Sequence, residues 1–430
     1  MYKQVKKIVP TLQKYIKNTP LERNKFLSDK YNSNIFFKRE DLQFTRSFKI
    51  RGAFNKIIKN NHTNLVTASA GNHAQGVAFA CNILNKHGTI FLPNTTTLQK
   101  INRINYFGKS NIDIKIVGNN FNESLQSALD YTNNTNNTNN TNNTNNTNNK
   151  LFIHPFDDLD IIEGQATIAD EIAQEIQPDY ILCSVGGGGL ISGISEYYNS
   201  IHNNNINNNI NNNINECKII GVESDGAASL TKSLYYNRRL RLINIDPFVD
   251  GASVAQVGIN NYNILKNNKT KSITVKNGHI CHELINIYQN EGIVLEPAGV
   301  MPICALDKIQ DDIKGKTIVC VLSGGNNDIT RYNEIMELNL HYLNLKHYFI
   351  LEFVQKPKQL QTFINNILND GDDITRFEYI KKSNKNFGNV LVGIELQYED
   401  NLETIINNLN KYDYKYQKID IKNSIYDFIL

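Results

Sequence analysis

The twelve residues Leu65-Val-Thr-Ala-Ser-Ala-Gly-Asn-His-Ala-Gln-Gly76 pass from an apolar run through a tight glycine turn into a helical pattern. Residues 65–68 predict a buried strand and residues 74–83 a helix, with the turn at Gly71-Asn72. A strand followed at once by a helix is the unit from which parallel sheets are built. Such a turn presents Asn72 and backbone N–H groups to a ligand above the sheet.

The same alternation extends on both sides of this stretch, from about residue 35 to about 325. The sequence predicts further strands at 89–92, 112–117, 180–185, 217–222 and 317–322, and helices at 98–107, 122–131, 161–176 and 190–198. This order is typical of an α/β fold with largely parallel sheets. Beyond about residue 335 the predicted order changes to βαββαβ, which indicates a ferredoxin-like module.

The predicted domains are residues 1–335 and 336–430. Two low-complexity tracts interrupt the first domain: Thr-Asn-Asn repeats at 132–149 and an Asn/Ile tract at 203–215. Because they carry little apolar surface, we expect them to be disordered loops. Each follows a predicted helix, at a point where surface insertions are tolerated.

Composition excludes several classes of protein. The net charge of +3 and the lack of a long charged run argue against nucleic acid or a membrane surface as the main partner. No apolar run approaches the roughly 20 residues of a membrane span, and the first residues lack the apolar stretch of a secretory signal. The six cysteines form no C-x-x-C pair, which favours reduced thiols over zinc or disulfide frameworks. We expect a soluble cytoplasmic protein.

Lys49 is the first candidate for chemistry. It lies between Phe48 and Ile50 at the start of a predicted helix. Apolar surroundings and a helix N-terminus both disfavour the ammonium form, so the amine could be neutral and form a Schiff base. Taken alone, the segment favours a solvated surface lysine over a Schiff-base lysine.

The second candidate is Gly186-Gly187-Gly188-Gly189-Leu190, between a predicted strand and a predicted helix. Four glycines let the backbone wrap around an anion at a helix N-terminus. Neither a Lys-Ser/Thr nor the G-x-G-x-x-G spacing is present, so a small monophosphate fits better than a nucleotide. A merely flexible loop is the alternative.

Two further positions lie at strand ends. Ser323 offers a neutral hydroxyl after the strand 317–322, and on its own it is a weak signal. His73 is compatible with a general base and equally with a structural histidine.

Taken together and in order, these motifs resemble the pyridoxal-phosphate enzymes of the tryptophan-synthase-β type (fold type II), and among them the threonine dehydratases, also called threonine deaminases. The C-terminal part is similar to the single ACT-like regulatory domain of the short biosynthetic form. The segments that carry the resemblance are Thr19-Pro-Leu21, Phe37-Lys-Arg-Glu-Asp41, Ser47-Phe-Lys-Ile-Arg-Gly-Ala53, Ala68-Ser-Ala-Gly-Asn-His73, Gly186–Leu190, Asp250-Gly-Ala-Ser-Val-Ala255, Glu296-Pro-Ala-Gly299, Ser323-Gly-Gly-Asn326, Leu345-Lys-His-Tyr-Phe-Ile350 and Asp372-Asp-Ile-Thr-Arg-Phe-Glu-Tyr379.

The resemblance implies an activity and a role for each motif residue. It implies dehydration of L-threonine, with L-serine as a further substrate, to 2-oxobutanoate and ammonia at the start of isoleucine biosynthesis. Lys49 would hold pyridoxal 5'-phosphate as a Schiff base, and Gly186–Leu190 would bind its phosphate. Asn72 would contact the ring hydroxyl and Ser323 the ring nitrogen. Substrate contacts would come from Ser69, Ala70, Gly71 and His73.

The resemblance also sets expectations for control and assembly. It implies a homotetramer regulated by L-isoleucine or L-valine at the C-terminal domain. Lys358 follows Pro357 where the family typically has Pro-Gly, which weakens this expectation. Related serine racemases place a serine at the position of Ala70, so racemisation is disfavoured. Their cation site is matched by Glu223 but not by Ser229, so we expect no required metal.

Two alternatives stay open, and a third is set aside. A degradative L-serine/L-threonine dehydratase is disfavoured by the C-terminal module, because control by an end product belongs with biosynthesis. A catalytically inactive amino-acid sensor is disfavoured by the retention of Lys49, Asn72, the glycine loop and Ser323. An RNA-recognition role for the βαββαβ module lacks the aromatic strand that such modules use.

Overall fold

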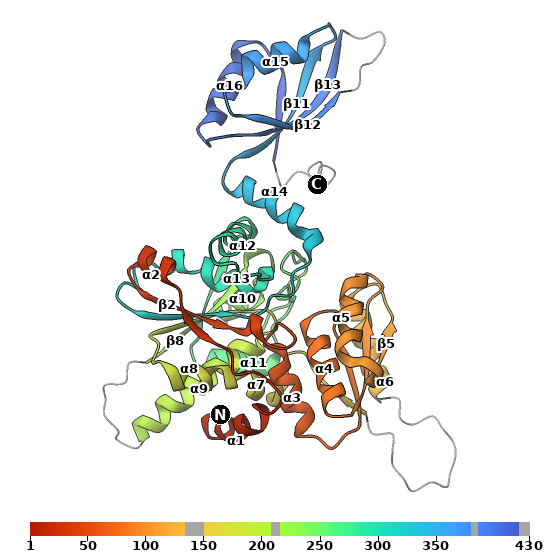
Figure 1. Ribbon diagram of the computed structural model, residues 1–430, viewed down its shortest axis with the longest axis vertical. Helices are drawn as coiled ribbons and strands as arrows, with labels where there is room; N and C mark the ends of the chain where they lie inside the picture. Colours follow the sequence, from red (N-terminus) through yellow and green to blue (C-terminus); the bar gives the residue numbers. More distant parts are fainter. Residues whose placement is uncertain (134–149, 208–215, 380–385, 421–430) are drawn as a thin grey trace. The chain divides into compact units, whose positions relative to one another are not determined.

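The computed structural model describes residues 1–133, 150–207, 216–379 and 386–420 (Figure 1). The first residues of the two Asn-rich tracts continue α6 (Phe121–Asn133) and α9 (Gly189–Asn207), and the rest of both tracts lies outside the described residues. The chain divides into two compact units, Met1–Asn327 and Asp328–Leu430. The boundary expected at residue 335 lies inside α14 (Tyr332–Tyr342), which belongs to the second unit.

The larger sheet of the first unit has the strand order β1-β2-β10-β7-β8-β9 over the described residues. Apart from β1, which pairs antiparallel with β2, neighbouring strands are parallel. The strands, in chain order, are β1 (Leu21–Arg23), β2 (Asn34–Arg39), β7 (Tyr180–Ser184), β8 (Lys218–Ser224), β9 (Lys271–Val275) and β10 (Thr317–Leu322).

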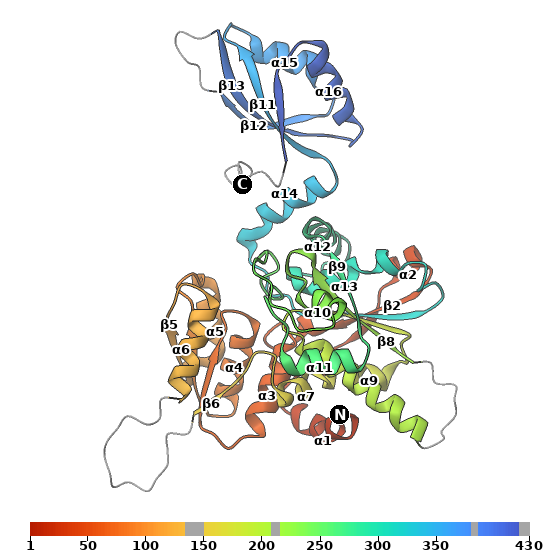
Figure 2. The same ribbon diagram turned by 180° about the vertical axis from the view of Figure 1, so that it is seen from behind.

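The smaller sheet has the order β5-β4-β3-β6 and is parallel throughout. Its strands are β3 (Asn64–Ala68), β4 (His87–Leu92), β5 (Ile112–Ile116) and β6 (Lys150–Phe152). Figures 1 and 2 show α4 (Asn72–Ile83), α5 (Leu98–Gly108) and α6 gathered around it.

Both faces of the smaller sheet are covered, which explains why its strands are apolar runs and do not alternate with polar residues. Leu65 packs in the cluster that contains α4 and α5 residues, whereas its neighbour Val66 packs with Ala128 of α6. The larger sheet also packs on helices, with Ile181 of β7 and Val319 of β10 in one cluster with residues of five helices. These helices are α1 (Tyr2–Leu12), α8 (Thr167–Glu175), α9, α10 (Ser229–Tyr235) and α11 (Ile259–Asn267).

The second unit has the predicted βαββαβ order. Its antiparallel sheet runs β12-β13-β11-β14, which is the ferredoxin-like arrangement. The elements are β11 (Lys346–Val354), α15 (Gln359–Ile367), β12 (Asp373–Tyr379), β13 (Phe387–Glu395), α16 (Asn401–Lys411) and β14 (Tyr416–Ile419). The sequence pattern predicts strands over 374–381 and 414–421 in this unit, and the last residues of both lie outside the described residues.

One predicted helix is divided in the structure. Residues 161–176 form α7 (Leu159–Gln165) and α8, with Ala166 between them. At this point α9 approaches closely, because a Cβ on Gly193 would lie 2.6 Å from the Ile162 carbonyl oxygen and 2.8 Å from the Ala166 nitrogen. Such a long-range contact leaves no local signal in the sequence.

Several elements between 225 and 305 were not predicted from the sequence. They are α10 (Ser229–Tyr235), α11 (Ile259–Asn267), β9, α12 (Asn277–Glu291) and α13 (Pro297–Cys304). The short strands β1, β2 and β6 were also not predicted.

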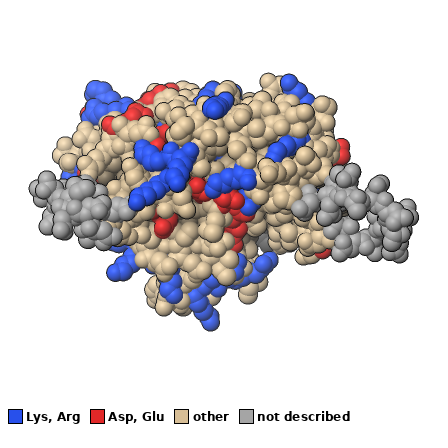
Figure 3. Space-filling view, turned by 90° about the horizontal axis from the view of Figure 1, so that it is seen from below, with Lys and Arg blue, Asp and Glu red and all other residues tan. Residues whose placement is uncertain are grey.

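The cysteines and surface charges agree with the composition. All six thiols are free, and only Cys217 is not fully buried. Among the described residues, we find no helix with the length and apolarity required to span a bilayer. On the face shown in Figure 3, basic and acidic side chains lie interspersed among a majority of uncharged residues.

Candidate functional site

The strand order of the first unit defines where a ligand site should form. In the smaller sheet the chain runs outward from β3 through β4 to β5, and then returns to place β6 on the other side of β3. In the larger sheet β10 likewise returns to lie beside β7. Ligands of open parallel sheets bind at such switch points, outside the carboxyl ends of the strands. The loops there contain Asn72 after β3, Pro155 after β6, Gly186–Gly189 after β7 and Ser323 after β10.

Lys49 is the first residue of α3 (Lys49–Ile58), and its side chain is half-buried. Its Nζ donates to the Pro155 carbonyl oxygen at 2.9 Å and lies 5.2 Å from the centre of the Phe48 ring. Burial lowers the pKa of this amine to about 8, against an opposing effect of the Glu296 carboxylate. A substantial fraction of the amine is therefore neutral near physiological pH, as a nucleophile or a proton acceptor requires.

The glycine loop needs its glycines for space and for backbone conformation. Gly188 has φ +95°, where a side chain is strained. A Cβ on Gly187 would lie 2.1 Å from the Phe156 ring, and one on Gly189 would lie 3.0 Å from the Phe156 carbonyl oxygen. Gly189 begins the long helix α9, whose N-terminal N–H groups favour an anion. Bare backbone at a helix N-terminus fits a phosphate group.

Asn72 is the first residue of α4 and is held at both ends of its amide. Its Nδ2 donates to both carboxylate oxygens of Glu296, at 2.8 and 2.9 Å. Its Oδ1 accepts from Asn326 Nδ2 at 2.7 Å. The side chain therefore has a defined orientation at the switch point between β3 and β6.

The rest of the turn divides into accessible and buried residues. Ser69, Ala70 and Gly71 are half-buried, and the Gly71 N–H donates to Ser69 Oγ at 3.3 Å. His73 is buried, with Nε2 3.1 Å from the Ile153 carbonyl oxygen. Burial, followed by the charge of Lys49, lowers the pKa of His73 to about 3, so the ring is neutral. This position fits the structural interpretation of His73.

Ser323 is buried directly after β10, and its Oγ donates to the Ala298 carbonyl oxygen at 3.4 Å. Its own carbonyl oxygen accepts from the Phe48 N–H at 3.1 Å. Ser47 and Gly324 form a β-bridge beside this contact. The residue after β10 is thus attached directly to the segment that precedes Lys49.

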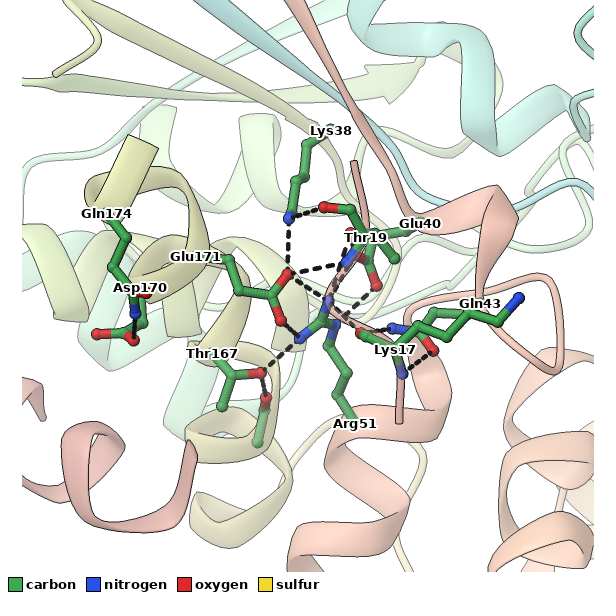
Figure 4. A network of polar contacts seen from close by, with 11 residues as sticks. Lys17, Thr19, Lys38, Glu40, Gln43, Arg51, Thr167, Asp170, Glu171 and Gln174 are labelled. Atoms are coloured by element: carbon green, nitrogen blue, oxygen red, sulfur yellow. Dashed lines mark hydrogen bonds and ion pairs between the residues drawn. The ribbon is translucent and has the colours of Figure 1, made fainter. Parts of the chain in front are cut away.

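A buried polar network supports the start of α3 (Figure 4). The Arg51 guanidinium is fully buried between the carboxylates of Glu40 and Glu171, with four N···O distances between 2.6 and 2.8 Å. Lys38 adds a second cation, 2.6 Å from Glu171. Two cations and two carboxylates balance each other, as a buried charge requires. Through Arg51, which lies two residues after Lys49, the network holds α3 against β2 and α8.

Glu223 does not have the surroundings of a metal ligand. Its carboxylate is buried and accepts from the backbone N–H groups of Leu230 and Thr231 at 2.8 and 2.7 Å, and from the Thr231 hydroxyl. Within the described ranges, no three His, Cys, Asp or Glu side chains are grouped so that they could hold a metal ion. That no metal is required stays a prediction.

Sequence reasoning did not select several residues that complete the site. Glu296 and Asn326 belong to quoted motifs, but only the structure shows that they hold Asn72. Pro155 contributes a carbonyl oxygen, so its residue type gave no signal. Arg51 belongs to the same quoted motif as Lys49, but its two carboxylate partners lie elsewhere in the sequence.

Comparisons with known proteins agree with this geometry. The family described as "Pyridoxal-phosphate dependent enzyme" matches residues 12–324, and "C-terminal regulatory domain of Threonine dehydratase" matches residues 337–429. A biosynthetic L-threonine dehydratase (IlvA) of Halalkalibacterium halodurans is 43% identical over 98% of this chain and 97% of its own. One from Staphylococcus aureus strain NCTC 8325 is 41% identical over 97% and 96%.

Solved structures give the same result for the fold. The processed form of threonine deaminase isoform 2 from Solanum lycopersicum superimposes with a TM-score of 0.68 at 32% identity, covering 78% of this chain and 92% of that one. Serine racemase from Dictyostelium discoideum gives 0.65 at 25% identity, covering 76% and 99%. The predicted α/β fold with a C-terminal regulatory domain is confirmed. This chain belongs to the pyridoxal-phosphate-dependent enzymes and, among them, to the threonine dehydratases with a C-terminal regulatory domain.

Proposed function

We propose that the protein deaminates L-threonine by dehydration, giving 2-oxobutanoate and ammonia as the first step of isoleucine biosynthesis, and that it also accepts L-serine. The observation that carries the proposal is the meeting of Lys49, the glycine loop and Ser323 at the two switch points of one unit. The near full-length similarity to biosynthetic threonine dehydratases supports the substrate. The regulatory module favours this function over the degradative one.

The residues present fit pyridoxal 5'-phosphate. Lys49 would hold the cofactor covalently, Gly186–Gly189 and Leu190 would bind its phosphate, and Asn72 would contact its ring hydroxyl. Ser323 would face the ring nitrogen with a neutral hydroxyl, which cannot protonate that nitrogen strongly. When bound, the cofactor supplies an electron sink for the electrons of the Cα–H bond.

The reaction needs a base on one face of the substrate, and Lys49 is placed to be that base. Once the substrate amine has taken its place on the cofactor, the partly neutral Lys49 amine accepts the Cα proton. The electrons of the Cα–H bond form the Cα=Cβ bond as the Cβ–O bond breaks, and the hydroxyl leaves as water with the proton that Lys49 accepted. The enamine then hydrolyses in solution to the keto acid and ammonia. The Ala70 side chain has no acidic proton to give to the opposite face of the substrate, so racemisation is not expected.

The absorption spectrum of the purified protein tests this function. We expect a yellow imine band that changes on addition of L-threonine, with release of 2-oxobutanoate, and loss of both in Lys49→Ala. Lys56 lies in the same helix and forms ion pairs with Asp158 and Asp160. Lys56→Ala is therefore the matched control and should keep the band. A colourless wild-type protein that releases no keto acid would support the inactive sensor instead.

We further propose that L-isoleucine or L-valine binds the second unit. A groove of about 440 Å³ lies between the end of β11, α15 and the segment before β14. Its wall combines apolar surface with charges of both signs, which suits an apolar zwitterion. The lining residues that supply these features are Val354, Phe387, Tyr412, Glu352, Lys356 and Asp413.

Titration of the full chain with each amino acid tests this site. We expect L-isoleucine or L-valine to lower the activity, and Val354→Trp to abolish the effect because it fills the groove from a partly exposed position. Ile364→Trp, also partly exposed but outside the groove lining, should leave the response intact. Flat curves for the wild type would refute control by these ligands.

The assembly and compartment are also proposals. The family resemblance supports a homotetramer, and six free thiols suit the reducing cytoplasm. Light scattering of the purified protein measures the mass of the assembly directly.

A further inference from the structure

Glu296 and Asn326 hold the Asn72 amide from opposite ends. Asn72 Nδ2 donates to both oxygens of Glu296, and Asn72 Oδ1 accepts from Asn326 Nδ2. Asn326 Nδ2 also donates to the Thr45 carbonyl oxygen at 2.8 Å, which fixes its own orientation. The three side chains come from the start of α4, the residue before α13 and the loop after β10. The contact between Asn72 and Glu296 spans 224 positions in the chain.

The Glu296 carboxylate lies in a tight enclosure. It is buried, and a Cβ on Gly324 would lie only 2.5 Å from its Oε1. A Cβ on Gly251 would lie 3.4 Å from the same oxygen. The two glycines therefore leave the space that the carboxylate occupies, and a side chain at position 324 would displace it from Asn72.

The charges around Glu296 come from three further elements. Lys49 at the start of α3 and Lys100 of α5 lower its pKa, whereas Asp250 raises it, and Lys100 and Asp250 form an ion pair with each other at 2.6 Å. Burial is the largest influence and raises the pKa of Glu296 to about 7. The Glu296 carboxylate in turn raises the pKa of Lys49, because it favours the protonated amine.

We propose that Glu296 is a positioning residue that, with Asn326, aims the Asn72 amide at the ring oxygen of the cofactor. This inference rests on the proposed function, because it assumes that Asn72 faces the cofactor ring. With the cofactor bound, Asn72 can give one N–H to the ring oxygen and keep the other on Glu296. A carboxylate holds that second N–H more strongly than a neutral acid does.

Two substitutions separate the geometric role from the electrostatic one. Glu296→Gln keeps an oxygen acceptor and removes the charge, whereas Asn326→Ser removes the contact to Asn72 Oδ1 and keeps the charge of Glu296. For both variants we would measure the dissociation constant of pyridoxal 5'-phosphate by absorbance and the pH titration of the imine band without substrate. Glu291→Gln, an exposed glutamate bonded to Asn24, is the matched control for the charge change.

The two roles predict different results. We expect Asn326→Ser to weaken cofactor binding about tenfold, the effect of roughly one hydrogen bond, and to keep the wild-type inflection near pH 7. Glu296→Gln should lose that inflection, and Glu291→Gln should match the wild type in both measurements. Thermal melting confirms that each variant is folded.

Failure of this inference differs from failure of the proposed function. An imine band in the wild type, with the same affinity and the same titration in both variants, would overturn the role of Glu296 while leaving the function intact. A wild type without any imine band would overturn the proposed function itself.

Discussion

At the scale of single residues, the proposed attachment of the cofactor to Lys49 requires the amine without its extra proton. Burial lowers the pKa of this amine to about 8, so its neutral fraction grows as the pH rises through 8. We predict that the cofactor-free protein forms the imine band at a rate that rises with pH, with a midpoint near 8. The ordinary lysine value would place the midpoint above 10.

Removing the negative charge of Glu296 provides the control for this experiment. The Glu296 carboxylate favours the ammonium form of Lys49, so Glu296→Gln should move the midpoint to lower pH. Stopped-flow absorbance between pH 6 and pH 10 would measure both curves. A shift to higher pH would contradict the assigned electrostatics.

At the scale of secondary-structure elements, the start of α15 contains a residue in an unfavourable conformation. Lys358, the N-cap of α15, has φ +65° in the left-handed region. This conformation costs a residue with a side chain about 1 kcal/mol that glycine does not lose. The left-handed backbone at this position therefore gives a physical reason for the glycine in the family's Pro-Gly pattern.

We predict that Lys358→Gly stabilises the second unit by about 1 kcal/mol, as measured by denaturant unfolding of the full chain. Glu403→Gly, within α16, should destabilise the same unit by a similar amount, because helical glycine is unfavourable. If both substitutions lowered the stability, strain at Lys358 would not be the reason.

At the scale of the whole molecule, local sequence patterns predicted helices and strands but not which of them lie side by side. The apolar runs predicted β3, β7 and β10, and Lys49 lies at a helix start as predicted. The helices predicted from residues 74 and 190 begin slightly earlier in the structure, at Asn72 and Gly189. The position of β10 between β2 and β7 has no local signal, although it brings Ser323 to Phe48. Glu296 was missed as a partner of Asn72 for the same reason.

The close approach of Phe156 to Gly187 connects the glycine loop to the segment that contacts Lys49. The Phe156 ring fills the space above Gly187, and the preceding residue, Pro155, bears the carbonyl oxygen that accepts from Lys49. Any side chain at 187 would push the ring aside and transmit that displacement along one peptide unit to the amine. A side chain at 187 would therefore disturb both the glycine loop and the carbonyl oxygen that accepts from Lys49.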